Sequence, residues 1–194
     1  MAVVLLLVAL GAFVARSILH DGLSANANPT ALETALAHGA RYLAMPSSAK
    51  RQVNPTPDSD EVRREGMLHF ADHCAVCHAN DGSGDTLYGN GMYPHPPDLR
   101  SADTQALADG ELFWIIENGV RFTGMPAFAG HDDGVGSWKL VRFIRHLPKL
   151  STEERMEMGR ANPKSDEDRK EEQEEEEFLK GAPAQSTPSH EHHH

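Results

Sequence analysis

The sequence predicts an all-α protein, because two kinds of segment alternate along the chain. In the first kind, apolar residues recur every three or four residues, which places them on one face of a helix. This spacing is found in residues 32–43, 62–70, 112–116 and 138–147. The segments between them are rich in glycine, proline, asparagine and aspartate, which favour turns and extended loops.

Composition divides the 194 residues into four expected regions. Residues 1–20 are a signal or membrane-anchor helix, and residues 28–57 are a helix followed by a Pro-rich connector. Residues 58–150 form the folded domain, and residues 151–194 are an acidic tail, helical or disordered. The net charge of −11 disfavours nucleic-acid binding, which needs a basic face. It suits solubility or a basic partner surface.

The amino-terminal residues predict a segment that targets the chain to a membrane. The apolar run at residues 2–15 is short for a spanning helix, which needs about 20 residues, but it is long enough for a signal-peptide core. Ala25-Asn26-Ala27 offers a cleavage site, and an uncleaved anchor with Arg16 at the membrane interface fits as well. Either interpretation carries the rest of the chain across a membrane, and a buried core helix is the alternative.

The next helix is expected to be capped by Asn28, with Pro29 at its first position, and to end at Met45-Pro46. Its residues 32–43 make one apolar face. The prolines of residues 47–57 then predict an extended connector around the domain.

The folded domain is expected to begin with a helix capped by Ser59 or Asp60. Gly66 and Phe70 lie one turn apart in it, and a small residue beside a large one permits another helix to cross closely. The crossing helix is expected at residues 137–147, where Pro148 ends it.

The helix that Ser59 or Asp60 caps leads into His73-Cys74-Ala75-Val76-Cys77-His78, which holds both cysteines of the chain. This Cys-x-x-Cys-His pattern is typical of covalent haem attachment, because two thiols at this spacing can add to the two vinyl groups of one haem. His78 can then ligate the iron from one face. A zinc site would need a second ligand pair, which no other cysteine supplies. A redox dithiol would need a βαβ context, whereas the flanks look helical.

The loops after the motif are expected to support His78. Residues 80–91 are rich in turn-forming residues, and residues 93–99 must be extended because prolines fix φ. A carbonyl of Pro96 or Pro97 is expected to accept the ring N–H of His78 and fix its orientation. Two helices are expected to follow. The first covers residues 101–108, and the second is capped by Asp109 and ends before Gly119.

Met125 is expected to be the second axial ligand of the iron. It lies in a loop braced by glycine and proline, where packing alone does not require methionine. Histidine alone would leave an open face suited to small ligands, whereas added methionine closes it, raises the potential and suits electron transfer. A packing methionine is the alternative. Met92 and, less strongly, His131 are rival ligands, but Met92 follows His78 by only fourteen residues, which leaves little chain to cover the haem.

Together these motifs resemble a class I mono-haem cytochrome c. The resemblance covers about residues 59–148 and points to the bacterial cytochrome c family that also furnishes haem-carrying subunits of terminal oxidases. It implies a compact all-α fold around one covalent haem c, with Cys74 and Cys77 attached to the haem and His78 and Met125 on the iron. It also implies an electron carrier rather than an enzyme.

The acidic tail begins with a capping-box pattern at residues 151–154, which predicts a short helix. The charge run at residues 171–177 predicts a solvated helix or a disordered tail, since like charges repel. Docking on a basic partner is the alternative. The histidines at the end of the tail, His190 and residues 192–194, could bind Cu²⁺, Ni²⁺ or Zn²⁺, or belong to an expression tag.

These observations predict a cytochrome that shuttles single electrons between a donor and an acceptor protein, and a membrane oxidase or reductase is a candidate for one of the two. It is expected in the bacterial periplasm, anchored to the inner membrane by the amino-terminal helix or free after cleavage. Two alternatives stay open. The distal site could open for a small ligand or peroxide, as in a sensor or a peroxidase-like protein. The histidine tail could instead handle copper.

Overall fold

The computed structural model describes residues 1–21, 24–25, 27–130, 132–164, 170, 173–176 and 178 of the 194-residue chain. The chain forms two units, Met1–Ala161 and Asn162–His194. Every regular element among the described residues is helical, as the sequence predicts. The terminal histidines lie outside the described residues, and so does part of the charge run at 171–177.

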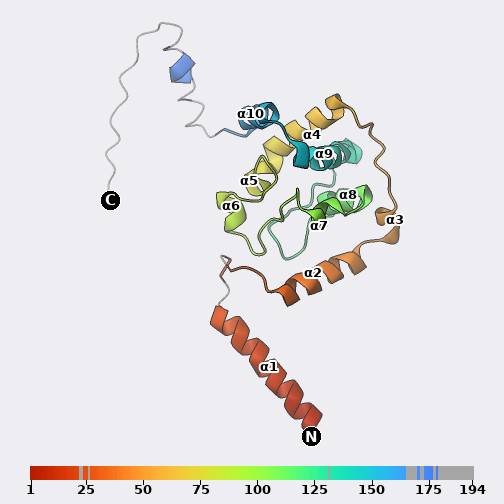
Figure 1. Cartoon of the computed structure of the whole chain (residues 1–194), viewed down its shortest axis with the longest axis vertical. Helices are drawn as coiled ribbons and strands as arrows, with labels where there is room; N and C mark the ends of the chain where they lie inside the picture. Colours follow the sequence, from red (N-terminus) through yellow and green to blue (C-terminus); the bar gives the residue numbers. More distant parts are fainter. Residues whose placement is uncertain are drawn as a thin grey trace. The chain divides into compact units, whose positions relative to one another are not determined.

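The elements of the first unit are helices of 3 to 20 residues (Figure 1). In chain order they are α1 (Ala2–Asp21), α2 (Ala31–Ala44), α3 (Ser47–Lys50), α4 (Asp60–His73), α5 (Ala75–His78), α6 (Leu87–Asn90), α7 (Ala102–Gln105), α8 (Asp109–Asn118), η1 (Asp132–Gly134), α9 (Val135–His146), η2 (Leu147–Lys149) and α10 (Thr152–Ala161).

The centre of the fold is the crossing of α4 and α9, and the sequence prediction of this crossing is confirmed. A Cβ placed on Gly66 would lie 2.2 Å from the backbone oxygen of Lys139, so only glycine lets α9 approach this closely. Phe70 and Phe143 pack beside the contact with ring centroids 5.2 Å apart. On α4, the hydroxyl of Ser59 accepts the N–H of Val62, which identifies Ser59 as the predicted cap.

The core extends beyond the expected boundary at residue 150. Met158 of α10 is fully buried in the main hydrophobic cluster, and α10 packs on α4. The predicted capping box is present, because the Ser151 hydroxyl accepts the N–H of Glu154 while the Glu154 carboxylate accepts the N–H of Ser151. Residues 151–161 of the predicted tail therefore belong to the first unit.

The connector between α2 and α4 is fastened to the domain at both ends. At its start, Met45 and Ala49 are buried against Ile115 of α8. Near its end, the side-chain amide of Asn54 donates to the carbonyl of Trp138 at 2.9 Å. Residues 52–59 contain no helix or strand, whereas residues 47–50, which were expected to be part of the connector, form the short helix α3.

The helix α2 differs from its prediction in two ways. Its cap is Thr30 rather than Asn28, because the Thr30 hydroxyl accepts the N–H of Glu33 and the Glu33 carboxylate accepts the N–H of Thr30. Its apolar face is not buried, since Leu32, Leu36 and Leu43 are all exposed. The helical spacing was correct, but spacing alone does not say what covers a face.

The two helices after the Pro-rich loop also differ at their ends. The helix expected at residues 101–108 is only the single turn of α7. The cap of α8 is Ala108 rather than Asp109, which is already the first helical residue. The Ala108 N–H donates to the Glu111 carboxylate at 2.8 Å, so this acceptor comes from inside the helix rather than from the cap itself.

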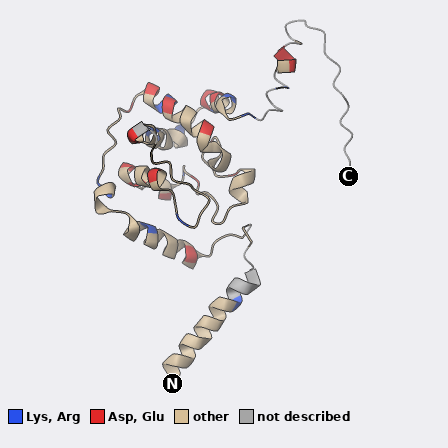
Figure 2. Ribbon diagram, turned by 180° about the vertical axis from the view of Figure 1, so that it is seen from behind, with Lys and Arg blue, Asp and Glu red and all other residues tan. Residues whose placement is uncertain are grey.

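The segment expected as a signal or membrane-anchor helix at residues 1–20 forms α1. Its described side chains end at Arg16, which is the only charged one among them (Figure 2). Within the described residues, no helix is long and apolar enough to cross a membrane, so the predicted membrane anchor is not supported.

Candidate functional site

The Cys-x-x-Cys-His motif lies where α4 passes into the single turn of α5. Cys74 is both the C-cap of α4 and the N-cap of α5. The backbone N–H groups of Cys77 and His78 donate to the Cys74 carbonyl at 3.1 and 2.9 Å. Residues three and four positions apart lie on one helix face. This turn therefore presents both thiols and the imidazole together.

The two cysteines are free and half-buried. Burial raises the pKa of the Cys74 thiol to about 12, and the neighbouring Cys77 adds to this effect. Redox-active dithiols of the Cys-x-x-Cys type have a depressed pKa that makes one sulfur a thiolate. The environment of Cys74 is the opposite, which argues against the redox-dithiol interpretation.

His78 sits in a largely apolar environment. Its ring packs on Phe70 with centroids 6.4 Å apart. Burial lowers the pKa of His78, and the backbone carbonyl of Pro97 acts in the opposite direction. A neutral imidazole is the form that ligates a metal. Two free thiols and a neutral imidazole on one turn are a donor set that fits a covalently attached haem.

The Pro-rich loop lies against the loop that follows His78. The N–H of Gly84 donates to the His78 carbonyl at 2.9 Å, and the N–H of Leu99 donates to the Gly82 carbonyl at 2.8 Å. The two loops touch so closely that a Cβ on Gly84 would lie 2.7 Å from the Pro96 oxygen. Pro97, one of the two predicted acceptors, is thereby brought to His78. Nδ1 of His78 is nevertheless buried without a hydrogen bond of good geometry.

Met125 is held by a compact loop after α8. Gly119 ends α8 as predicted, with the positive φ of +63° that favours glycine. The Val120 N–H donates to the Met125 carbonyl at 3.2 Å, and the Met125 N–H donates to the Thr123 hydroxyl at 3.1 Å. The Met125 side chain is half-buried and packs against both hydrophobic clusters, as Cys74 does against the main one.

The structure brings the two candidate methionines together. A Cβ on Gly124 would lie 2.6 Å from the sulfur of Met92, so Met92 rests on the backbone next to Met125. The short chain between His78 and Met92 therefore does not keep Met92 away from Met125. His95 in the nearby Pro-rich loop has its Nδ1 3.2 Å from the Gly89 carbonyl. The rival ligand His131 lies outside the described residues.

Comparison with known families adds one match. The family model described as "Cytochrome C oxidase, cbb3-type, subunit III" matches residues 61–144, from the first turn of α4 to the last turn of α9. This match supports a cytochrome c domain at residues 61–144. The resemblance predicted from the sequence is thus confirmed, and the family is related to subunit III of cbb3-type oxidases. No curated protein matches the chain.

The match to this family supports haem-based electron transfer in general and an electron carrier rather than an enzyme. It also suggests a periplasmic or membrane-associated protein with redox partners. Within the described part of the chain, no group of three or more His, Cys, Asp or Glu residues could hold a further metal ion.

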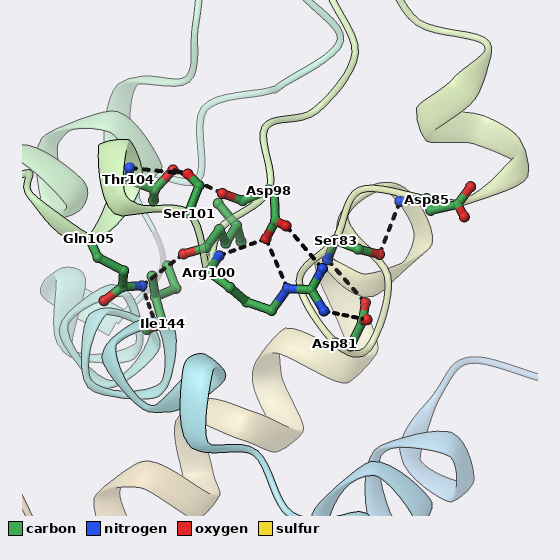
Figure 3. Close-up of polar contacts among 10 residues, drawn as sticks. Asp81, Ser83, Asp85, Asp98, Arg100, Ser101, Thr104, Gln105 and Ile144 are labelled. Carbon is green, nitrogen blue, oxygen red and sulfur yellow. Dashed lines mark hydrogen bonds and ion pairs between the residues drawn. The ribbon is translucent and has the colours of Figure 1, made fainter.

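Sequence reasoning missed one part of the cytochrome c domain. Arg100 lies between two carboxylates, with Nη1 2.7 Å from Asp81 and with Nε and Nη2 each 2.9 Å from Asp98 (Figure 3). Asp98 and Arg100 are close in sequence, whereas Asp81 comes from the loop after His78. The local signal in the sequence was an arginine two residues after an aspartate, which points to Asp98 but not to Asp81.

Proposed function

We propose that this protein carries single electrons between redox proteins through one covalent haem c. Cys74 and Cys77 would hold the haem covalently, and His78 and Met125 would ligate its iron. The observation that supports this best is the single turn of α5, which presents two free thiols and an imidazole with a buried Nδ1 inside a cytochrome c domain. When bound, the haem supplies the one-electron couple of its iron.

Each residue has a physical task in this proposal. The α5 turn presents both sulfurs on one face, where they would form covalent bonds to the two vinyl groups of one haem. The neutral His78 would supply a nitrogen ligand to the iron. The hydrogen-bonded loop at residues 119–128 positions the Met125 thioether, which favours ferrous over ferric iron and suits a carrier of moderate to high potential.

The partners are proposed from the family and the charge. The matching family is named for an oxidase subunit, so a membrane oxidase or reductase is proposed as the acceptor and a second redox protein as the donor. The acidic surface suits basic partner surfaces. We place the protein in the bacterial periplasm.

The attachment is tested by removing both thiols. Protein carrying Cys74→Ala and Cys77→Ala is expected to release its haem into acidified acetone, whereas the wild type retains it after denaturation. The double variant is also expected to fold poorly, because the core is built around the cofactor. Retention of haem by the double variant through the extraction would show that the attachment is elsewhere.

An absorption spectrum separates the electron carrier from a protein with an open distal site. Methionine ligation of ferric haem gives a low-spin spectrum with a weak far-red charge-transfer band. An open or water-ligated iron gives a high-spin spectrum instead, and that result would favour the sensor or peroxidase-like alternative.

A further inference from the structure

The placement of Pro97 depends on how two loops are joined. Pro97 follows the segment that touches Gly84 and immediately precedes Asp98, and Leu99 donates its N–H to Gly82. The loop after His78 is itself short and tightly turned, since the Ser83 N–H donates to the Asp81 carboxylate at 3.0 Å. Any change in the distance between the loops therefore moves the Pro97 carbonyl relative to the His78 ring.

Arg100 spans these two loops (Figure 3). Its guanidinium binds Asp98 with both Nε and Nη2, the two-pronged geometry that fixes direction as well as distance. The remaining Nη1 reaches Asp81, three residues after His78. The Arg100 backbone N–H also donates to the Asp98 carboxylate at 2.8 Å.

The same loop is anchored to the core on its other side. The side-chain amide of Gln105 donates to the carbonyls of Leu99 at 2.7 Å and Ile144 at 3.0 Å, which ties the loop to α9. The Thr104 hydroxyl donates to the Asp98 carbonyl at 3.2 Å. The segment at residues 97–100 is thus held between the centre of the fold and the loop after His78.

The ion pairs themselves supply little stability. The Arg100 side chain is 36% exposed and that of Asp98 41% exposed, and solvent screens pairs of this kind. Their value is geometric, because they fix the relative position of the two loops. A group that orients a ligand's hydrogen-bond partner tunes the metal without touching it.

We propose that Arg100 is a positioning residue that holds the Pro97 carbonyl toward Nδ1 of His78 and thereby lowers the reduction potential of the haem. This inference rests on the proposed function. A carbonyl that accepts from the imidazole N–H makes the other nitrogen a stronger donor to iron, and a stronger donor favours the ferric state. Loosening the link is therefore expected to raise the potential.

The test measures the reduction potential of the holoprotein for three substitutions. Arg100→Lys retains the positive charge but cannot form the two-pronged contact. If Arg100 acts by positioning, Arg100→Lys raises the reduction potential, so that a larger fraction of the haem is ferrous at a fixed solution potential. If only its charge matters, Arg100→Lys leaves the potential unchanged. Arg100→Gln also separates the two: positioning predicts a rise, and loss of a positive charge predicts a fall. Asp98→Asn is expected to raise the potential as well.

Arg64→Gln is the matched control, because it removes one arginine from an exposed ion pair with Glu157, on the α4–α10 side of the domain. It is expected to leave the potential unchanged. A second measurement is the solvent exchange of the His78 ring N–H by NMR in the reduced protein, which is expected to be faster in the Arg100 variants and unchanged in the control.

The outcomes separate this inference from the proposed function. A wild type without covalent low-spin haem would overturn the proposed function itself. A normal wild type with an unchanged potential in Arg100→Lys, or a lower one in Arg100→Gln, would overturn only the role of Arg100. If the Arg100 variants do not accumulate, Asp98→Asn decides through ring N–H exchange, and slow exchange as in the wild type would contradict the inference.

Discussion

The Met125 side chain is half-buried in the loop after α8, and it is the proposed second ligand of the iron beside His78. Met125→His is expected to retain a low-spin, six-coordinate haem with a lower potential, because histidine is the stronger donor to ferric iron. Met125→Ala is expected to leave the position open to water, cyanide or imidazole. Absorption spectra and potentiometric titration measure both effects.

Met92→Ala is the matched control for Met125, and it is expected to stay low-spin. Because Met92 rests on Gly124, a small change in potential is compatible with this expectation. A Met92→Ala variant that binds cyanide readily, beside an unaffected Met125→Ala, would move the ligand to the Pro-rich loop.

A pH dependence also belongs to the scale of single residues. The hydrogen bond from Arg100 holds the pKa of Asp98 below its usual value. In the unfolded chain an aspartate titrates at about pH 3.9. The contribution of Asp98 to stability is therefore complete above that pH and is lost as the pH falls through the lower folded pKa. Denaturant midpoints measured between neutral and acid pH are expected to fall less steeply below about pH 4 for Asp98→Asn than for the wild type.

Among single residues, contacts within one turn were predictable and contacts between distant loops were not. Cys74, Cys77 and His78 share one helical turn, so their spacing in sequence already determines their spacing in the molecule. The link from Arg100 to Asp81 spans nineteen residues and two loops, and no local pattern reports such a contact. The approach of Met92 to the backbone beside Met125 was missed for the same reason.

At the scale of elements, hydrophobic spacing predicted where helices form but not always which surface covers them. Gly66 and Phe70 correctly predicted the crossing with α9, since a glycine one turn from a phenylalanine is a specific packing signal. The leucines of α2 have equally regular spacing, yet Leu32, Leu36 and Leu43 are exposed. Spacing identifies a face, and only tertiary contacts show its partner.

Substitution by alanine is expected to change stability in opposite directions at two glycines, one at the α4–α9 crossing and one in α10. Gly66→Ala is expected to destabilise the protein by about 1–3 kcal/mol or more, because the added methyl meets the Lys139 backbone. Gly159→Ala in α10 is expected to stabilise it by about 0.5–1 kcal/mol, since nothing lies within 4 Å of the added methyl and alanine favours the helix. Urea titrations of both variants measure this, and equal midpoints would contradict the close crossing.

At the scale of the whole molecule, composition misplaced the end of the folded unit. Residues 151–161 look like the start of an acidic tail, because α10 is mostly polar and has one fully buried side chain, Met158. A single anchoring residue is too little for hydrophobic spacing to detect.

Two truncations test where the folded unit ends. Removal of residues 162–194 is expected to leave both the haem spectrum and the unfolding midpoint unchanged. Removal of residues 151–194 is expected to retain the low-spin spectrum but to cost about 2–5 kcal/mol, as loss of a buried methionine does. Equal midpoints for the two truncated forms would show that α10 contributes nothing to stability.

The burial of Met45 and Ala49 against Ile115 has a practical consequence for work on this protein. The family match starts at residue 61, so a shortened form beginning near residue 58 would be a natural choice for crystals or electrochemistry. Such a form would lack the residues that back α8 and the Met125 loop, because both Ile115 and Met125 pack in that cluster. It would expose their apolar surface to water and loosen the support of the proposed methionine ligand. A reduction potential or ligand-binding rate measured on the shortened form would differ from that of the full chain because this support is missing. A form that begins before Met45 retains the support.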